Sequence, residues 1–208
     1  MYWSEFLTIA LAHLLAVASP GPDFIVVTKQ SMTAGTRPAL WTSLGVGGAI
    51  LLHVTYCILG VAILLTQSPD LFRITRFLAA AYLVYLGIQA LRNARFSRKG
   101  VGQADQFRPA GTAKRAFMLG FLTNGLNPKA TLFFLALFTA VIDDSTPTLI
   151  QAAYGIYMAV ATFIWFAALS LLLTTARVRD TLLRAGVWLE GGMGVVLILL
   201  AVQIVATG

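Results

Sequence analysis

Long apolar stretches separated by short polar segments dominate this sequence and leave it few ways to fold. Of its 208 residues, 58% are hydrophobic and only 11% are charged, and the mean hydropathy is +0.81. This composition lies outside the range of water-soluble domains and is typical of proteins that cross a membrane several times. Because backbone groups in hydrocarbon need internal partners, the sequence predicts an all-α membrane protein.

Turn-forming clusters of Gly, Pro, Asn, Asp and Ser divide the chain into six apolar stretches. At 1.5 Å per residue each stretch covers a hydrocarbon core of about 30 Å, with tilt or a break absorbing the excess. The predicted transmembrane helices cover residues 5–29, 38–66, 71–91, 115–142, 148–175 and 182–206.

The charged residues predict the orientation of these helices. Basic residues gather after the first, third and fifth stretches, at Lys29, Arg37, Arg92, Arg95, Arg98, Lys99, Arg108, Lys114, Arg115, Arg177, Arg179 and Arg184. The other side holds most of the acidic ones, namely Glu5, Asp70, Asp143 and Asp144, although Arg73 and Arg76 also fall there. Since Lys and Arg concentrate in cytoplasmic loops, both termini are expected to face outward. The net charge of +7 therefore reflects topology, and we expect no nucleic-acid partner.

Two of the apolar stretches are interrupted by proline, and each interruption carries a charge of opposite sign. The first is Ser19-Pro20-Gly21-Pro22-Asp23 and the second is Asn124-Gly125-Leu126-Asn127-Pro128-Lys129. An ionised side chain in hydrocarbon costs several kcal/mol unless it has a partner, so such residues are functional candidates. Broken helices are tolerated at this depth only where they are buried in protein or line a cavity. The pattern indicates a transporter whose substrate carries both charges.

The positions of the breaks predict an internal repeat. Three stretches precede the polar segment 93–113 and three follow it, and each half begins with a broken helix. An odd number of helices per half places the halves in opposite orientations, with a binding site near the midplane. We therefore expect inverted three-helix repeats at 1–92 and 114–208, joined by a flexible, basic cytoplasmic linker at 93–113.

The residues of each break suit the start of a new helix. Asn127 can cap through its side-chain oxygen, with Pro128 at the first helical position, and Ser19 followed by Pro20 has the same logic. A helix start presents free N–H groups and a positive dipole end to an anion such as a carboxylate. The predicted substrate-binding residues are Gly21, Pro22, Asp23, Asn124, Asn127, Pro128 and Lys129.

Asp23 and Lys129 are the central candidates. Asp23 is expected to bind a substrate ammonium group or to take up a coupling proton, and Lys129 to meet a substrate carboxylate. The alternative is a permanent ion pair that joins the two halves, and a pair that opens for a zwitterion combines both interpretations. His53 and Glu190 lie within apolar stretches and are further proton-coupling candidates. For His53 a satisfied core group is equally plausible, and for Glu190 a structural ion pair is favoured.

Other classes of function fit the sequence less well. Cys57 is the only cysteine, which excludes a disulfide or a thiolate metal site within the chain. A divalent-metal or small-cation exporter would need clustered ligands, whereas these are scattered, and we expect no metal or cofactor. Motifs of intramembrane hydrolases are missing, so no enzymatic activity is expected. A non-catalytic membrane subunit remains an alternative that would not need opposite charges at two breaks.

The same motifs resemble those of the LysE/RhtB family of amino-acid exporters. Ser19-Pro20-Gly21-Pro22-Asp23 is similar to its first-helix signature, in the form of the threonine-exporter branch. The fourth-helix signature is matched by Leu122-Thr123-Asn124 with Asn127-Pro128-Lys129, and the third-helix motif by Ala81-Tyr82-Leu83-Val84-Tyr85-Leu86-Gly87. The resemblance implies proton-driven export of threonine, homoserine or related L-amino acids across the bacterial inner membrane, by alternating access. It does not fix the amino acid, and a homo-oligomer is compatible with it.

Overall fold

The computed structural model describes residues 2–19, 21–96, 107–143, 145–172 and 176–207, and within these it contains helices only. Side chains at 62–67, 69, 72, 93, 95–96, 140, 176–187 and 207 lie outside the description. The helices are α1 (Tyr2–Ala18), α2 (Pro22–Ala34), α3 (Thr36–Gln67), α4 (Pro69–Phe96), α5 (Ala113–Gly125), α6 (Pro128–Ala140), α7 (Thr148–Leu172) and α8 (Ala176–Thr207).

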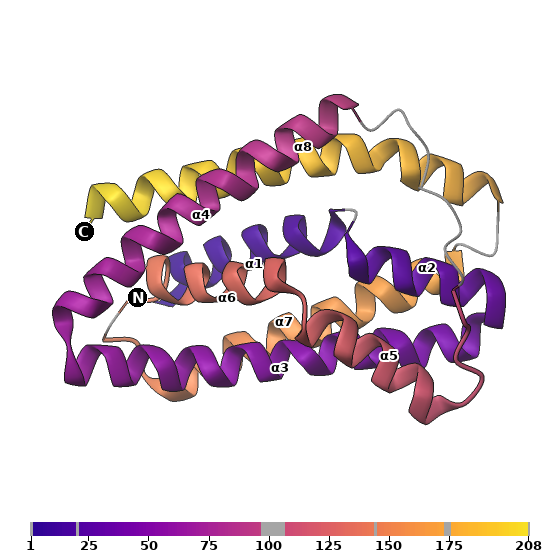
Figure 1. Cartoon of the computed structure of the whole chain (residues 1–208), viewed down its shortest axis with the longest axis horizontal. Helices are drawn as coiled ribbons and strands as arrows, with labels where there is room; N and C mark the ends of the chain where they lie inside the picture. The colour runs from indigo at the N-terminus through magenta and orange to yellow at the C-terminus, as the bar shows by residue number, and fades with distance from the viewer. Residues whose placement is uncertain (1, 20, 97–106, 144, 173–175, 208) are drawn as a thin grey trace.

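The long helices form two pairs, and the short helices lie among them (Figure 1). α4 packs along α8, and α3 packs along both α7 and α5. Between the pairs, α1 contacts α7 and α8, and α6 contacts α3 and α4. The largest buried cluster lies where these helices meet and includes Ile9, Leu83, Leu137, Met158 and Leu197. α1 and α6 therefore pack between the two pairs of long helices.

Both termini lie at the same end of the bundle (Figure 1). At this end the Glu5 carboxylate of α1 accepts the backbone N–H of Asp143 at 2.6 Å. It also accepts the hydroxyls of Thr146 at 3.1 Å and Tyr154 at 2.9 Å. These bonds tie the start of α1 to α7 and to the loop before it, at the end that the sequence predicts to face outward.

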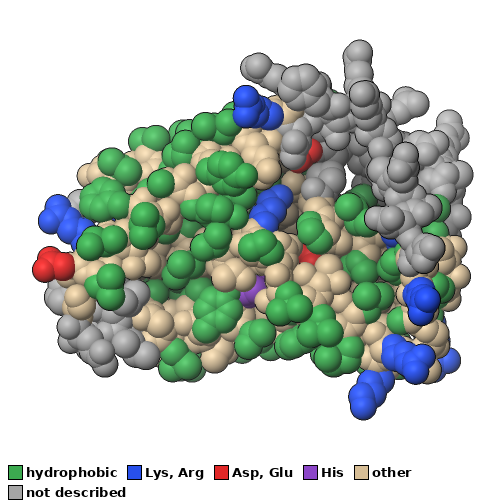
Figure 2. Space-filling model, viewed as in Figure 1, with side chains coloured by type: hydrophobic (Ala, Val, Ile, Leu, Met, Phe, Trp, Pro, Cys, Tyr) green, Lys and Arg blue, Asp and Glu red, His purple; other side chains and the backbone are tan. Residues whose placement is uncertain are grey.

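The surface of the bundle is rich in apolar side chains (Figure 2). Large hydrophobic residues are exposed on most helices, among them Leu7, Leu78, Ile156, Ile164 and Leu199. Exposed apolar surface of this extent is what a lipid bilayer covers. In the same view several Lys and Arg side chains gather at one end, away from the apolar middle.

By length and composition, the described helices give fewer full spans than the six expected. α3, α4, α7 and α8 are each long and apolar enough to cross a membrane, and the bent pair of α1 and α2 makes a fifth candidate. α5 and α6 have 13 residues each, or about 20 Å at 1.5 Å per residue. Because this is shorter than a hydrocarbon core of about 30 Å, neither crosses alone.

Glycines bring α5 against α3 at very short range. A Cβ placed on Gly45 of α3 would lie 2.0 Å from the Phe117 carbonyl oxygen, and one on Gly120 of α5 would lie 2.0 Å from that of Thr42. Gly194 of α8 approaches α4 in the same way, with Gly87 as its neighbour. Small residues allow membrane helices to make such close contacts.

The predicted linker 93–113 differs from expectation at both of its ends. α4 continues through Phe96, and the segment 97–106 lies outside the described residues, together with Arg98, Lys99 and Asp105. At the far end, Gln30 of α2 donates to the Ala110 carbonyl at 2.7 Å and accepts its N–H at 3.2 Å. Both backbone polar groups of Ala110 are thus hydrogen-bonded to the side-chain amide of Gln30. Thr112 then caps α5 by accepting the Arg115 N–H.

Candidate binding cavity at two helix breaks

The first break lies between α1 and α2, which meet at an angle of 52°. α2 begins with Pro22 in its first turn, and its N-cap is Gly21, an extended residue that offers no side-chain cap. The expectation that Ser19 would cap a new helix is wrong, because its hydroxyl is buried and has no hydrogen-bond partner. Proline disfavours helical geometry in the residue before it, so Pro22 keeps Gly21 out of the helix. Pro20 lies outside the described residues.

The second break lies between α5 and α6, and hydrogen bonds order its turn residues. Asn127 caps α6, with its side-chain oxygen accepting the Lys129 N–H at 3.0 Å and Pro128 in the first turn. Its own N–H donates to the Asn124 carbonyl at 2.9 Å. The predicted cap by Asn127 is confirmed.

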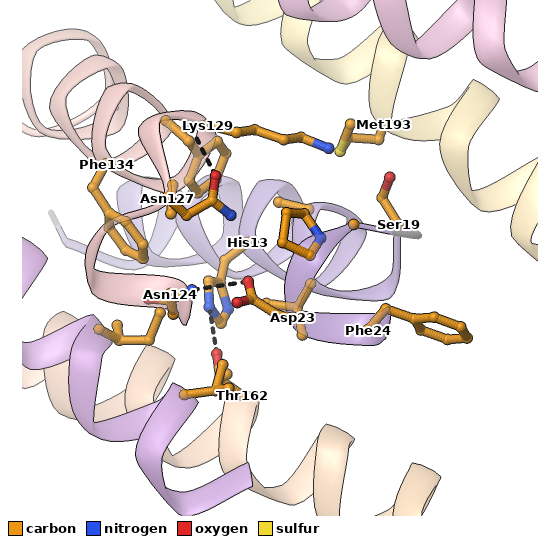
Figure 3. Close-up of a pocket in the computed structure, with 18 of the residues that line it drawn as sticks. His13, Ser19, Asp23, Phe24, Asn124, Asn127, Lys129, Phe134, Thr162 and Met193 are labelled. Carbon is orange, nitrogen blue, oxygen red and sulfur yellow. Dashed lines mark hydrogen bonds between the residues drawn. The ribbon is translucent and has the colours of Figure 1, made fainter. Parts of the chain in front are cut away.

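One cavity lies between the two breaks (Figure 3). Its free volume is about 60 Å³, which by the usual measure is room for a few water molecules. All eight of the described helices contribute residues to its lining. The lining includes His13, Ser19, Gly21, Pro22, Asp23, Phe24, Asn124, Asn127, Lys129, Phe134, Thr162 and Met193. Both predicted charges therefore face a common space.

Asn124 connects the acidic side of the cavity to α3. Its side-chain N–H donates to Asp23 Oδ2 at 2.9 Å. His53 Nε2 lies 3.1 Å from both the carbonyl and the side-chain oxygen of Asn124, so the ring proton belongs on Nε2. Nδ1 is then an acceptor for the Tyr56 hydroxyl. The ring also stacks on Phe134, with centroids 5.2 Å apart, so His53 is fixed on every side.

Lys129 lies on the basic side of the cavity, at the start of α6. Two carboxylates, Glu190 and then Asp23, attract its charge. Among the interactions of the described residues, neither carboxylate forms an ion pair with the Lys129 amine within 4.0 Å. Glu190 also interacts with another group. In the close-up the Lys129 amine extends toward Met193, while Asp23 and His13 lie in another part of the cavity (Figure 3). The two charges are thus neighbours across a space and not a closed pair.

Most of the sequence-predicted residues come together here. Six of the seven predicted binding residues line the cavity, and Pro128 does not, since it forms the start of α6. Of the proton-coupling candidates, Asp23 lines the cavity, whereas His53 and Glu190 are buried behind its wall. Their roles in binding and proton transfer stay predictions.

Sequence reasoning missed three polar residues of the cavity. His13 of α1 is fully buried and pairs with Thr162 of α7, with 3.0 Å between Nε2 and Oγ1. Ser19 belongs to the first motif but was expected to act as a cap. A histidine in an apolar helix is a weak signal, and its partner lies 149 residues away in the chain. Nothing local marks such a pair.

Comparison with known proteins gives a consistent family. The chain is 29% identical over 191 residues to the threonine efflux protein of Escherichia coli K12, covering 91% of each chain. It is 36% identical over 149 residues to the leucine efflux protein of Salmonella choleraesuis, and this match covers 70% of this chain and 65% of that protein. No solved structure matches.

The profile of the LysE type translocators matches residues 14–208, nearly the whole chain and both breaks. This extent and the two curated relatives agree with the motif resemblance. The chain therefore belongs to the LysE type translocator family.

Proposed function

We propose that this chain exports L-amino acids of the threonine and homoserine kind, or related ones, across the bacterial inner membrane in exchange for protons. The observation that carries the proposal is that Asp23 and Lys129, from two separate helix breaks, line one buried cavity. Its relatives are named as threonine and leucine efflux proteins, which supports an amino acid as the substrate.

A zwitterion matches the charges of this cavity. Its ammonium group would meet the Asp23 carboxylate, and its carboxylate would meet the Lys129 amine and the Asn127 side-chain amide. The start of α6 adds a positive dipole end on the same side. Buried charges are stable only with a partner, so the substrate would replace the long-range attraction between Asp23 and Lys129 with direct contacts.

Transport would proceed by alternating access of two inverted repeats. In this proposal α1 with α2, and α5 with α6, each form one broken span, which gives six spans in total. The cavity lies at both breaks, and α8 packs on α1 while α4 packs on α6. These two contacts and the Glu5 bonds involve α1 and α6, which lie toward the end of the bundle that holds both termini (Figure 1). We therefore assign these contacts to the outer gate.

Asp23 is the proposed carrier of the coupling proton, because it alone among the three candidates lines the cavity. Protonation would remove the charge that holds the substrate ammonium and so release the substrate outward. His53 would position Asn124, and Glu190 would adjust the charge balance at Lys129.

Metal export is the main rival, and it has no comparable support. Among the described residues, no group of three His, Cys, Asp or Glu side chains is placed to hold a metal ion. A few acidic groups spread over separate helices would leave a divalent cation poorly coordinated.

Efflux from proteoliposomes tests the proposal. Vesicles containing the purified protein are loaded with each of the twenty amino acids, and efflux is followed with and without an imposed pH gradient. We expect efflux of a small set that includes threonine, homoserine or leucine-like substrates, accelerated when the receiving side is acidic. Asp23→Asn protein in matched vesicles serves as the control. Failure with all amino acids would overturn the proposal, and a response to divalent cations alone would favour the rival.

A further inference from the structure

We propose that His13 is a substrate ligand that shares the ammonium group with Asp23. The proposal rests on the proposed amino-acid substrate and names a contact residue that neither the motifs nor the family comparison indicates. His13 lies on α1, one helix turn and more before the first break, and its side chain is 1% exposed. It nevertheless lines the same cavity as Asp23 and Lys129.

The two ring nitrogens of His13 differ in their surroundings. Nε2 lies 3.0 Å from the Thr162 hydroxyl, whereas Nδ1 is buried without a hydrogen-bond partner. When Nε2 carries the proton and donates it to Thr162, Nδ1 is left as an acceptor. A buried acceptor without a donor costs about 1–3 kcal/mol, so a native protein keeps one where a ligand or an ordered water completes it.

Asp23 has a matching vacancy among its bonds. Asn124 donates to Oδ2 at 2.9 Å, while Oδ1 is buried and has no partner. Two unpaired acceptors thus belong to residues that line one small cavity, and His13 and Asp23 are drawn in the same part of it (Figure 3). An ammonium group has three N–H donors, so it can satisfy both acceptors at once. A carboxylate could satisfy neither.

His53 provides an internal comparison. Its Nε2 is held by Asn124 and its Nδ1 by the Tyr56 hydroxyl, and it lines no part of the cavity. Both nitrogens of the histidine that lies outside the cavity therefore have hydrogen-bond partners. Only one ring nitrogen of His13 has a hydrogen-bond partner. This difference supports a role for His13 as a ligand.

Two substitutions separate the roles of the two nitrogens. In His13→Gln the side-chain amide reaches about as far as Nε2, so the Thr162 bond is retained and the cavity acceptor is lost. In His13→Asn the amide lies near the position of Nδ1, so an acceptor faces the cavity while the Thr162 bond is lost. Both variants are purified in detergent and checked for the same elution profile and melting temperature as the unmodified protein.

The probes are L-leucine and its hydroxy analogue, 2-hydroxy-4-methylpentanoate, which lacks the ammonium group. Affinity for each is measured by competition with radiolabelled L-leucine, and the same pair is made for L-threonine. For His13→Gln we expect the affinity for the amino acid to fall roughly 10- to 100-fold, the value of a hydrogen bond to a charged group. Affinity for the hydroxy acid should stay unchanged. His13→Asn should remain close to the unmodified protein with both probes.

Other results would overturn the inference. Equal losses for the amino acid and the hydroxy acid in His13→Gln would mean a general disturbance of the cavity. A larger loss in His13→Asn than in His13→Gln would assign His13 to the Thr162 bond alone. If the unmodified protein bound neither amino acid, the proposed function itself would fail. Binding without any effect of His13 variants would leave that function standing and remove His13 from it.

Discussion

The two helix breaks line the same cavity, yet they are built in opposite ways. At the second break, Asn127 caps α6 and Asn124 is bonded to His53 and Asp23. At the first break, α2 starts without a side-chain cap, and the Ser19 hydroxyl and one Asp23 oxygen are left unpaired. The first break therefore has buried side-chain oxygens without a hydrogen-bond partner, whereas none of the buried side-chain atoms without a partner belongs to the described residues of the second.

The packing of the neighbouring helices follows the same division. α5 is held to α3 by backbone contacts at Gly45 and Gly120 that leave no space for a side chain. A Cβ placed on Gly21 at the first break would meet only the Ser19 carbonyl oxygen, at 3.8 Å, which is an ordinary contact. The comparison indicates that the second break, which carries Lys129, is held rigidly by the packing of α5 on α3. The first break has unpaired polar groups that are available to a ligand.

The largest expected effect comes from removing either charge. Asp23→Asn and Lys129→Met should each insert and fold but lose roughly 100-fold or more of their efflux, since a buried charge-assisted contact disappears. Efflux from proteoliposomes measures this, with Asp70→Asn and Lys114→Met as exposed controls that leave transport unchanged. Normal efflux by either cavity variant would contradict the assignment of this cavity as the substrate-binding site.

The next effect tests whether the second break is fixed. Gly120→Ala would force a Cβ to within 2.0 Å of the Thr42 carbonyl oxygen, and overpacking of this kind costs about 1–3 kcal/mol or more. Thermal unfolding in detergent should show a marked loss of stability. Gly60→Ala is the matched control, because it meets nothing within 4 Å. Equal melting temperatures for the two variants would contradict a locked α5.

A pair of small truncations addresses the difference between the breaks directly. Asn127→Ala removes a cap and should lower the free energy of unfolding by about 1 kcal/mol. Ser19→Ala removes a buried hydroxyl without a partner, so stability should stay equal or rise. Thermal melts and efflux are measured for both. If Ser19→Ala were the less stable variant, the first break would be as dependent on its polar groups as the second.

The smallest expected effect concerns the support of Asn124. His53→Leu removes the donor to Asn124 and should raise KM for efflux roughly fivefold, the value of one or two neutral hydrogen bonds. His53→Gln keeps a donor in that place and should change KM less. The pH profile of efflux should keep its shape in both, because in the proposed mechanism His53 positions Asn124 and Asp23 carries the proton. A displaced profile would return His53 to the proton-coupling candidates.

Local sequence signals predicted the features that depend on neighbouring residues. The Asn127-Pro128 cap follows from side-chain reach and a fixed φ angle, and the breaks follow from proline. In the Ser19-Pro20-Gly21-Pro22 motif the sequence predicted a helix start at Ser19-Pro20, whereas α2 begins at Pro22. Since both Ser19 and Gly21 precede a proline, continuous helix is possible only after Pro22.

Features that depend on distant residues could not be predicted. The His13–Thr162 pair and the Gln30–Ala110 pair join positions that are 149 and 80 residues apart. No period in the sequence reports which helix faces will meet.

The pairing of the long helices has a consequence for how the chain holds together. α4 packs along α8, and α3 along α7 and α5, so the most extensive interfaces join residues before the linker to residues after it. Neither half encloses an interior of its own. If the chain were cut in the linker, each separate fragment would expose the apolar interface that it forms with the other. Fragments produced together would carry complementary interfaces through which they could associate.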